Sequence, residues 1–208
     1  MGTYAETLDI AGGELVLAFT DTVDWRMSEQ PEEFLIGFAD LVEWGQDVGV
    51  LTDATADHLR EEARRRPSEA QGVLEGAIVL REAIYRVFEA LAHGRSPSSE
   101  DLDVLNGALS RALARLRLVL TAKGPAWDWN DDDDGLDRML WPVVRQAADL
   151  LTSQRLDRVG QCPGCGWLFL DQSRNRSRRW CSMAVCGNRA KARRHYERQR
   201  EESGRESG

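Results

Sequence analysis

All four cysteines of this 208-residue chain lie beyond residue 160, and they form two closely spaced pairs. Two residues separate Cys162 from Cys165, and four residues separate Cys181 from Cys186. Pairs at these spacings can direct four thiolates at one ion, because the small residues inside the first pair let backbone amides point at the sulfurs. The pattern predicts one structural Zn2+ per chain in a closed tetrahedral site. The open alternative is a set of unliganded or disulfide-paired cysteines.

Two absences in the sequence favour metal over disulfides. No run of about 18 apolar residues exists, so no transmembrane helix is expected. The first 14 residues contain no basic stretch followed by an apolar one, so no secretory signal is visible. We therefore expect a cytoplasmic protein with no membrane partner, in which the thiols stay reduced.

Charge is divided unevenly along the chain. The formal net charge is -8, but residues 160–208 carry +6 and residues 1–159 carry -14. Four thiolates around one zinc ion carry -2, which leaves the C-terminal segment at about +4. This asymmetry predicts an acidic domain joined to a basic interaction module.

The basic residues near the cysteines are almost all arginines, which pair with phosphates and with guanine edges. Double-stranded DNA is therefore the expected partner. The residues expected to contact it are Arg174, Arg176, Arg178, Arg179, Arg189, Lys191, Arg193 and Arg194. The alternative is a solvated helix that lies over the acidic N-terminal domain, because opposite charges in one chain attract.

Helical periodicity dominates residues 1–159, so the predicted fold class is mainly α: an orthogonal helical domain with a small β-hairpin. Apolar spacing and capping residues predict helices in the ranges 31–48, 53–66, 67–92, 99–116 and 136–151. Residues 14–25 favour a helix with an extended start. Residues 117–129 favour the hairpin, with its turn at Lys123, Gly124 and Pro125, and residues 130–135 an exposed acidic turn.

The zinc module has little apolar surface, so zinc binding is expected to drive its folding. Residues 167–170 favour a short strand, to which residues 178–180 are expected to return antiparallel. A basic helix is expected after Cys186. The predicted domains are therefore 1–159, which we expect to fold alone, and 160–203, followed by a disordered tail at 204–208.

The cysteine-rich segment carries several connected motifs. Residues 162–169 read Cys-Pro-x-Cys-Gly-x-x-Phe, residues 178–183 read Arg-Arg-Trp-Cys-Ser-Met, and residues 186–189 read Cys-Gly-Asn-Arg. Asp171 and Ser173 lie between them. With these residues the segment resembles the CGNR zinc-finger family.

The N-terminal part resembles the ABATE domain, which usually precedes this zinc finger. The resemblance rests on Leu-Ala-Phe at 17–19 and Thr-Val-Asp-Trp-Arg at 22–26, with Leu41 and Trp44 downstream. The family usually has Asn-Thr where this chain has Asp21 and Thr22. Together the two resemblances cover nearly the whole chain and imply a bacterial stress-induced transcription regulator.

Three functions remain open at this stage. The first is a DNA-binding regulator with structural zinc, whose helical domain senses a small ligand or forms a homodimer. A candidate ligand pocket comprises Asp21, Trp25, Arg26 and Trp44. The second is a zinc-stabilised protein-interaction module that binds no nucleic acid. The third, an enzyme using Asp21 or Asp24, is not favoured, since a turn explains these carboxylates equally well, and no catalytic residue is predicted.

Overall fold

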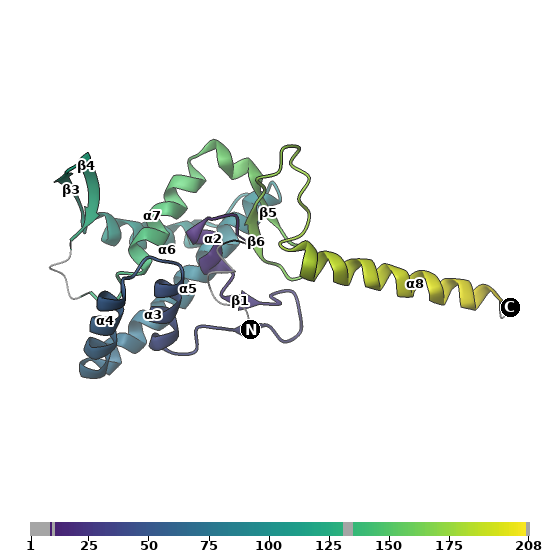
Figure 1. Cartoon of the computed structure of the whole chain (residues 1–208), viewed down its shortest axis with the longest axis horizontal. Coiled ribbons are helices and arrows are strands. Elements are labelled where there is room, and N and C mark those ends of the chain that lie inside the picture. Colours follow the sequence, from purple (N-terminus) through teal and green to yellow (C-terminus); the bar gives the residue numbers. More distant parts are fainter. Residues whose placement is uncertain (1–8, 10, 131–134, 207–208) are drawn as a thin grey trace.

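The computed structural model describes residue 9, residues 11–130 and residues 135–206 (Figure 1). Seven α-helices occur in these ranges: α2 (Leu15–Thr20), α3 (Phe38–Asp47), α4 (Asp53–Arg65), α5 (Pro67–Ala92), α6 (Ser99–Leu113), α7 (Leu140–Leu151) and α8 (Asn188–Glu206). Two shorter helical turns are η1 (Gln154–Arg158) and η2 (Met183–Gly187). No helix in the described ranges is both long and apolar enough to cross a membrane.

The strands form three separate two-stranded antiparallel sheets. They pair β1 (Val23–Asp24) with β2 (Glu32–Glu33), β3 (Leu116–Thr121) with β4 (Gly124–Trp129), and β5 (Val159–Gln161) with β6 (Leu168–Leu170). The mainly helical fold class predicted from the periodicity is confirmed.

The long helix α5 runs through the centre of the helical domain (Figure 1). Its apolar stripe, including Leu74, Ile84 and Phe88, is buried in the main core. The short helix α2 is buried along its whole length and packs against α5 and α7. The core is therefore built around two helices that lie far apart in sequence.

Two of the predicted helix starts are confirmed by their caps. Thr52 accepts a hydrogen bond from the backbone N–H of Thr55, and Ser98 accepts one from that of Asp101. Both caps satisfy N–H groups that a first helical turn leaves without a partner.

The helix predicted to begin at Pro31 begins instead at Phe38. Residues 32 and 33 pair with β1, and the Asp40 carboxylate accepts the backbone N–H groups of Ile36 and Gly37, at 2.9 and 2.7 Å. This carboxylate caps the helix at residue 38. Tertiary pairing therefore overrides the apolar periodicity of residues 34 and 35.

Three further boundaries differ from the prediction. Thr121 pairs with Gly124, so the turn of the β3–β4 hairpin is Ala122 and Lys123 rather than residues 123–125. Helix α7 begins at Leu140, because residues 136–139 form a turn first. The central residues of the predicted acidic turn, 131–134, lie outside the described residues.

In the C-terminal module the strand at 168–170 is confirmed, but its predicted partner is wrong. It pairs with β5, which lies before the cysteines, and residues 178–180 form no strand. Helix α8 continues to Glu206, into the segment expected to be a tail.

The main core extends across the predicted domain boundary. Val159, Leu168 and Leu170 from the β5–β6 sheet belong to the same buried cluster as the residues of α2 and α5. Backbone and side-chain hydrogen bonds cross the same junction: Leu170 N–H donates to Ala11 O, and Tyr85 Oη donates to Gly166 O. The helical domain thus forms the surface on which the cysteine module sits.

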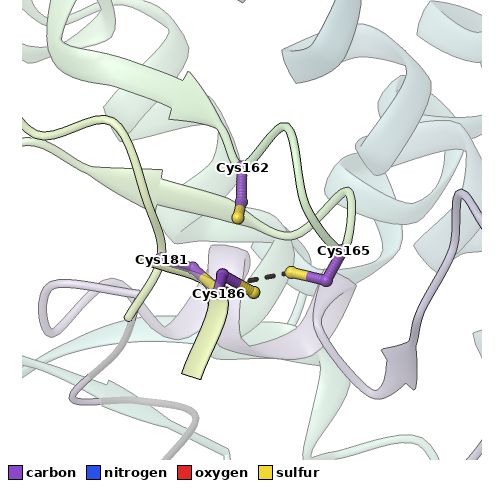
Figure 2. A group of neighbouring side chains, drawn as sticks. All are labelled: Cys162, Cys165, Cys181 and Cys186. Atoms are coloured by element: carbon purple, nitrogen blue, oxygen red, sulfur yellow. Dashed lines mark hydrogen bonds between the residues drawn. The ribbon is translucent and has the colours of Figure 1, made fainter. Parts of the chain in front are cut away.

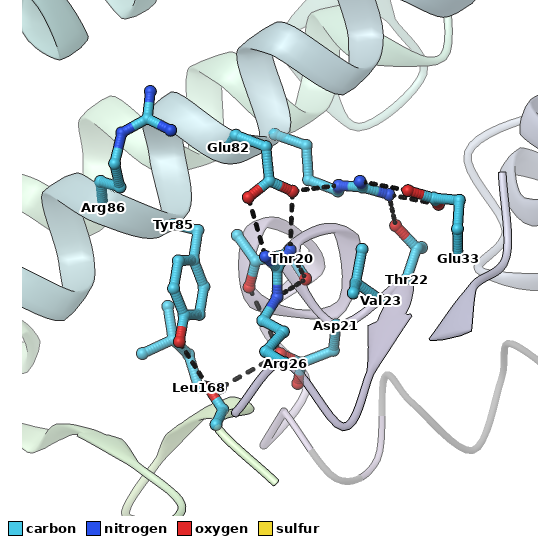
Figure 3. Close-up of polar contacts among 12 residues, drawn as sticks. Thr20, Asp21, Thr22, Val23, Arg26, Glu33, Glu82, Tyr85, Arg86 and Leu168 are labelled. Atoms are coloured by element: carbon cyan, nitrogen blue, oxygen red, sulfur yellow. Dashed lines mark hydrogen bonds and ion pairs between the residues drawn. The ribbon is translucent and has the colours of Figure 1, made fainter. Parts of the chain in front are cut away.

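A buried polar network lies within the helical domain, and the sequence did not single out its members Arg81, Glu33 and Glu82 (Figure 3). The Arg81 guanidinium, 2% exposed, bonds both carboxylate oxygens of Glu33 at 2.6 and 2.7 Å and also Glu82. Arg26 bonds Glu82 and the carbonyl of Thr20. Although burial opposes ionisation, the hydrogen bonds and charges of Arg26 and Arg81 hold the pKa of Glu82 below its ordinary value. One signal was present in the sequence, because Arg81 falls on the apolar stripe of α5.

Asp21 joins the two parts of the chain directly. It is fully buried, and its Oδ1 accepts the backbone N–H of Leu168 at 3.1 Å (Figure 3). Burial raises the pKa of this carboxyl well above its usual value, against the lowering effect of the Leu168 hydrogen bond and of Arg26. Because the folded-state pKa exceeds the unfolded one, Asp21 makes the free energy of unfolding fall as pH rises from about 4 through the raised pKa.

We predict that Asp21→Asn raises the melting temperature at neutral pH, because Asn keeps the acceptor for Leu168 and is neutral in both states, whereas folding disfavours the ionised form that Asp21 has in the unfolded chain. The difference in melting temperature between the variant and wild type should grow as pH rises from mildly acidic values and then become constant. Thermal unfolding followed by circular dichroism at several pH values measures it. A difference that is largest at acidic pH would show that Asp21 is not held protonated.

Candidate metal centre and basic module

The four cysteines converge on one buried point (Figure 2). Cys162 and Cys165 flank the turn after β5, Cys181 lies in the loop after β6, and Cys186 lies in η2. All four are buried, and their sulfurs lie within 4.8 Å of one another. The Sγ–Sγ distance is 3.4 Å between Cys165 and Cys181 and 3.7 Å between Cys181 and Cys186. None is disulfide-bonded.

This arrangement fits a tetrahedral zinc ion. Zn–S bonds of about 2.3 Å place the sulfurs of a tetrahedron about 3.8 Å apart, so small outward shifts would admit the ion. A disulfide would require an S–S distance of about 2.05 Å. The printed Sγ–Sγ distances are too long for a disulfide and close to those of a tetrahedral zinc site. The arrangement therefore matches metal ligation.

Without a cation the four thiols cannot all ionise. Hydrogen bonds from Cys165 and Cys181 hold the pKa of Cys162 far below the ordinary thiol value, and donating those bonds raises the pKa of both donors far above it. Burial raises the pKa of Cys186. A bound dication favours the thiolate at every position, so it would allow all four thiols to ionise together.

The first cysteine pair forms a tight knuckle. Cys162 N–H donates to Trp167 O and Gly166 N–H donates to Cys162 O, at 2.8 and 2.9 Å. Gly166 has a φ of +87°, and a Cβ there would approach Met27 and Arg26 to 3.0 and 3.1 Å. Glycine at 166 therefore lets the knuckle pack closely on the loop after β1.

The loop between the two cysteine pairs is held from inside by Asp171. Its carboxylate is buried and accepts the backbone N–H groups of Ser173 and Arg178, at 2.8 and 2.9 Å. Although burial opposes ionisation, these bonds and the Arg158 charge hold its pKa below the ordinary value. The loop is thus fixed by an internal anion rather than by an apolar core.

Arg178 is also part of the interior of this module. Its guanidinium donates to the carbonyls of Leu170, Trp180 and Cys181, at 3.2, 3.2 and 2.5 Å. It also lies 4.5 Å from the centroid of the Phe169 ring. Of the eight basic residues expected at a nucleic-acid surface, this one is turned inward toward protein carbonyls.

The other seven basic residues are exposed. Two of them contact aromatic rings: Arg179 lies 5.2 Å from the centroid of Trp180, and Arg189 lies 4.3 Å from that of Trp25. Arg174 and Arg176 lie in the loop after β6. Arg193, Arg194 and Lys191 lie on α8, which projects away from the body (Figure 1). The structure therefore divides them between a loop surface and a separate helix.

The four residues of the candidate ligand pocket have protein partners. Asp21 bonds Leu168, and the Arg26 guanidinium is bonded to Glu82. Trp44 is fully buried with its ring centroid 5.1 Å from that of Phe19, and Trp25 lies under Arg189. All four thus make contacts within the protein, and a ligand site here stays a prediction.

Comparison with known proteins gives separate matches for the helical domain and for the cysteine module. Residues 13–154 match a family model, ABATE, described as "putative stress-induced transcription regulator". The match spans more than half of the chain. The chain belongs to the ABATE family. Residues 158–199 match the CGNR zinc finger, and no curated protein matches the chain. Neither family is an enzyme family.

The four residues that give the CGNR module its name have distinct roles in this chain. Cys186 joins the sulfur cluster. A Cβ at Gly187 would lie 2.7 Å from the Sδ atom of Met183, so glycine fits the close approach of η2. Asn188 donates to Ala184 O at 3.1 Å and fastens the start of α8. Arg189 then lies on Trp25 of the ABATE domain.

We predict that Arg178→Ala destabilises the CGNR module by about 2 kcal/mol or more, because three carbonyls lose a charged donor. Urea unfolding of the zinc-loaded chain measures it. Arg174→Ala, an exposed arginine of the same loop, is the matched control and should change stability by less than about 0.5 kcal/mol. Equal effects of the two substitutions would contradict the interior role of Arg178.

Proposed function

We propose that this protein is a DNA-binding transcription regulator in which one zinc ion per chain is structural and the CGNR module contacts the duplex. The observation that carries the proposal is α8. It is 19 residues long and leaves the body of the protein (Figure 1). Its basic residues between 189 and 198 are exposed.

Helix α8 has no apolar stripe with which to pack on protein. Of its residues from 188 to 199, only Ala190, Ala192 and Tyr196 are apolar or aromatic. A helix this polar is stabilised by partners of opposite charge rather than by burial. Duplex DNA supplies such a partner along its whole length.

The spacing of the cations suits a groove with phosphates on both sides. Each residue advances the helix by about 100°, so cations accumulate on two nearly opposite faces. One face bears Arg193, with Arg189 at its base held on Trp25, and the other bears Lys191, Arg194 and Arg198. A helix about 10–12 Å across fits a major groove about 12 Å wide, with each cationic face toward one phosphate backbone.

The direction of α8 keeps the nucleic acid away from the acidic domain. Residues 1–159 carry -14, which would repel phosphates at short range. A helix of 19 residues is about 28 Å long, whereas exposed charges are screened beyond about 8 Å at physiological salt. Helix α8 extends away from the other helices (Figure 1), which does not favour the alternative in which the basic helix lies over the acidic domain.

Zinc has a structural role in this proposal. Four cysteines fill a tetrahedral shell and leave no position for water or substrate. The ion would join the knuckle after β5 to η2, and η2 leads directly into α8. Metal binding therefore fixes the start of the helix that contacts DNA.

The basic residues take different roles. Arg193 and Arg194 are the best candidates for phosphate contacts, because both are exposed on α8 and the ion pair of Arg193 with Glu197 is a surface pair that phosphate can replace. Arg174, Arg176 and Arg179 offer a second contact surface on the loop. Arg189 acts by positioning α8 through Trp25.

We predict that the zinc-loaded protein binds duplex DNA. The logarithm of its association constant should fall linearly with the logarithm of the salt concentration, with a slope of about 0.9 per phosphate contact. Arg193→Ala with Arg194→Ala should reduce that slope by about 1.8 and leave the zinc content unchanged. Fluorescence anisotropy over a salt series measures it.

The matched control is Arg64→Ala with Arg65→Ala, an equally adjacent exposed pair on α4 of the acidic domain. It should leave both affinity and slope unchanged. If zinc-loaded protein bound no duplex, or bound without salt dependence, the DNA proposal would fail. The second candidate, a zinc-stabilised protein-interaction module, would then explain the arginines.

A further inference from the structure

The β3–β4 hairpin has one uninterrupted apolar face. Residues directly opposite in an antiparallel pair share a face, and the next pair along the strands points to the other side. Three consecutive pairs on one face are Leu116 with Trp129, Leu118 with Trp127, and Leu120 with Pro125. The hairpin therefore presents a continuous ridge of large apolar side chains.

This ridge is exposed along most of its length. Leu118, Leu120 and Trp127 are 66%, 87% and 55% exposed. The base of the hairpin is anchored by Trp129, whose ring centroid lies 5.8 Å from that of Trp141, while its tip extends from the helices (Figure 1). An isolated two-stranded hairpin is marginally stable in water, and exposed apolar patches mark interaction sites.

A groove lies beside Trp141, which is one of its lining residues. It has a volume of about 640 Å³ and runs between α5, α6 and the start of α7. Gly72 and Gly76 open its wall, because a Cβ at either position would meet nothing within 4 Å. Val79, 55% exposed, adds apolar surface, whereas Trp141 lines the groove but is only 3% exposed. The groove can therefore accept side chains from another molecule.

Charge on the groove and on the hairpin is opposite. The groove is lined by three carboxylates, Glu69, Asp103 and Asp137, against one arginine, Arg111. Glu69 is also paired with Arg66 at 3.1 Å, which leaves a small acidic excess. On the hairpin Arg117 pairs with Asp128 at 3.6 Å, which leaves the exposed Lys123 of the turn as its net charge. An acidic groove thus faces outward beside a hairpin with a cationic tip.

We propose that these two features dock on each other between two copies of this chain. The hairpin of each copy inserts Leu118, Leu120 and Trp127 into the groove of the other, with Lys123 near the carboxylates. A two-fold axis satisfies both contacts at once, because a closed dimer uses the same surface of each subunit.

Sedimentation velocity of the full-length, zinc-loaded protein over a series of concentrations tests this dimer. We expect a reversible dimer, and Leu118→Gln with Leu120→Gln should raise its dissociation constant by about ten-thousandfold or more, because four apolar side chains per dimer lose their burial. Ile36→Gln is the matched control: Ile36 is 74% exposed but lies outside the hairpin and the groove, and its substitution should have no effect.

A complementation experiment tests the arrangement itself. Gly72→Leu with Gly76→Leu fills the groove at exposed helix positions where leucine favours the helix, so folding is retained. Neither the groove variant nor the hairpin variant should dimerise alone, but their mixture keeps one intact hairpin and one intact groove. We expect the mixture to form a weaker heterodimer.

Three results would overturn the proposal. The first is a wild-type protein that stays monomeric at every concentration. The second is a dimer that survives either pair of substitutions, or that Ile36→Gln removes equally. The third is a mixture that fails to associate, which would indicate hairpin-to-hairpin contact instead. Circular dichroism confirms that each variant keeps its helices.

Discussion

Four thiolates share a buried space only when a cation lies between them, and this constraint organises the C-terminal part of the protein. The sulfurs come from the knuckle after β5, the loop after β6 and η2, which have almost no apolar core of their own. The ABATE domain supplies the surface beneath them. Leu168 and Leu170 enter its core, and Asp21 accepts the backbone N–H of Leu168. Domain packing holds the module from one side, and the metal ligation that we propose would stabilise it from the other.

Contacts at this junction fix the position of helix α8. It begins two residues after Cys186, where Asn188 fastens its first turn and Arg189 lies on Trp25. Loss of the metal would release the first turn of α8, and loss of Trp25 would remove the contact that Arg189 makes beside it. A cationic helix fixed at one end is suited to present its length to an anion. If two copies dock through hairpin and groove, two such helices are presented together, as a regulator of palindromic sites requires.

The sequence predicted features that depend on local chemistry and missed those that depend on distant contacts. The cysteine spacing located the cluster of four cysteines, and Thr52 and Ser98 marked helix starts, because a helix cap depends only on residues within one turn. The partner of β6 was predicted wrongly, since residues 178–180 are drawn inward by Arg178, whose carbonyl partners no spacing rule identifies. The Arg81 network was missed for a similar reason: a charged residue on an apolar stripe signals a buried ion pair but does not name its partners.

The most direct measurement of the central claim is zinc-edge X-ray absorption on the full-length protein, combined with elemental analysis. We predict one zinc per chain with four sulfur neighbours at about 2.3 Å and no nitrogen or oxygen ligand. A shell that includes nitrogen or oxygen, a protein purified under reducing conditions without zinc, or a disulfide among the four cysteines would contradict it.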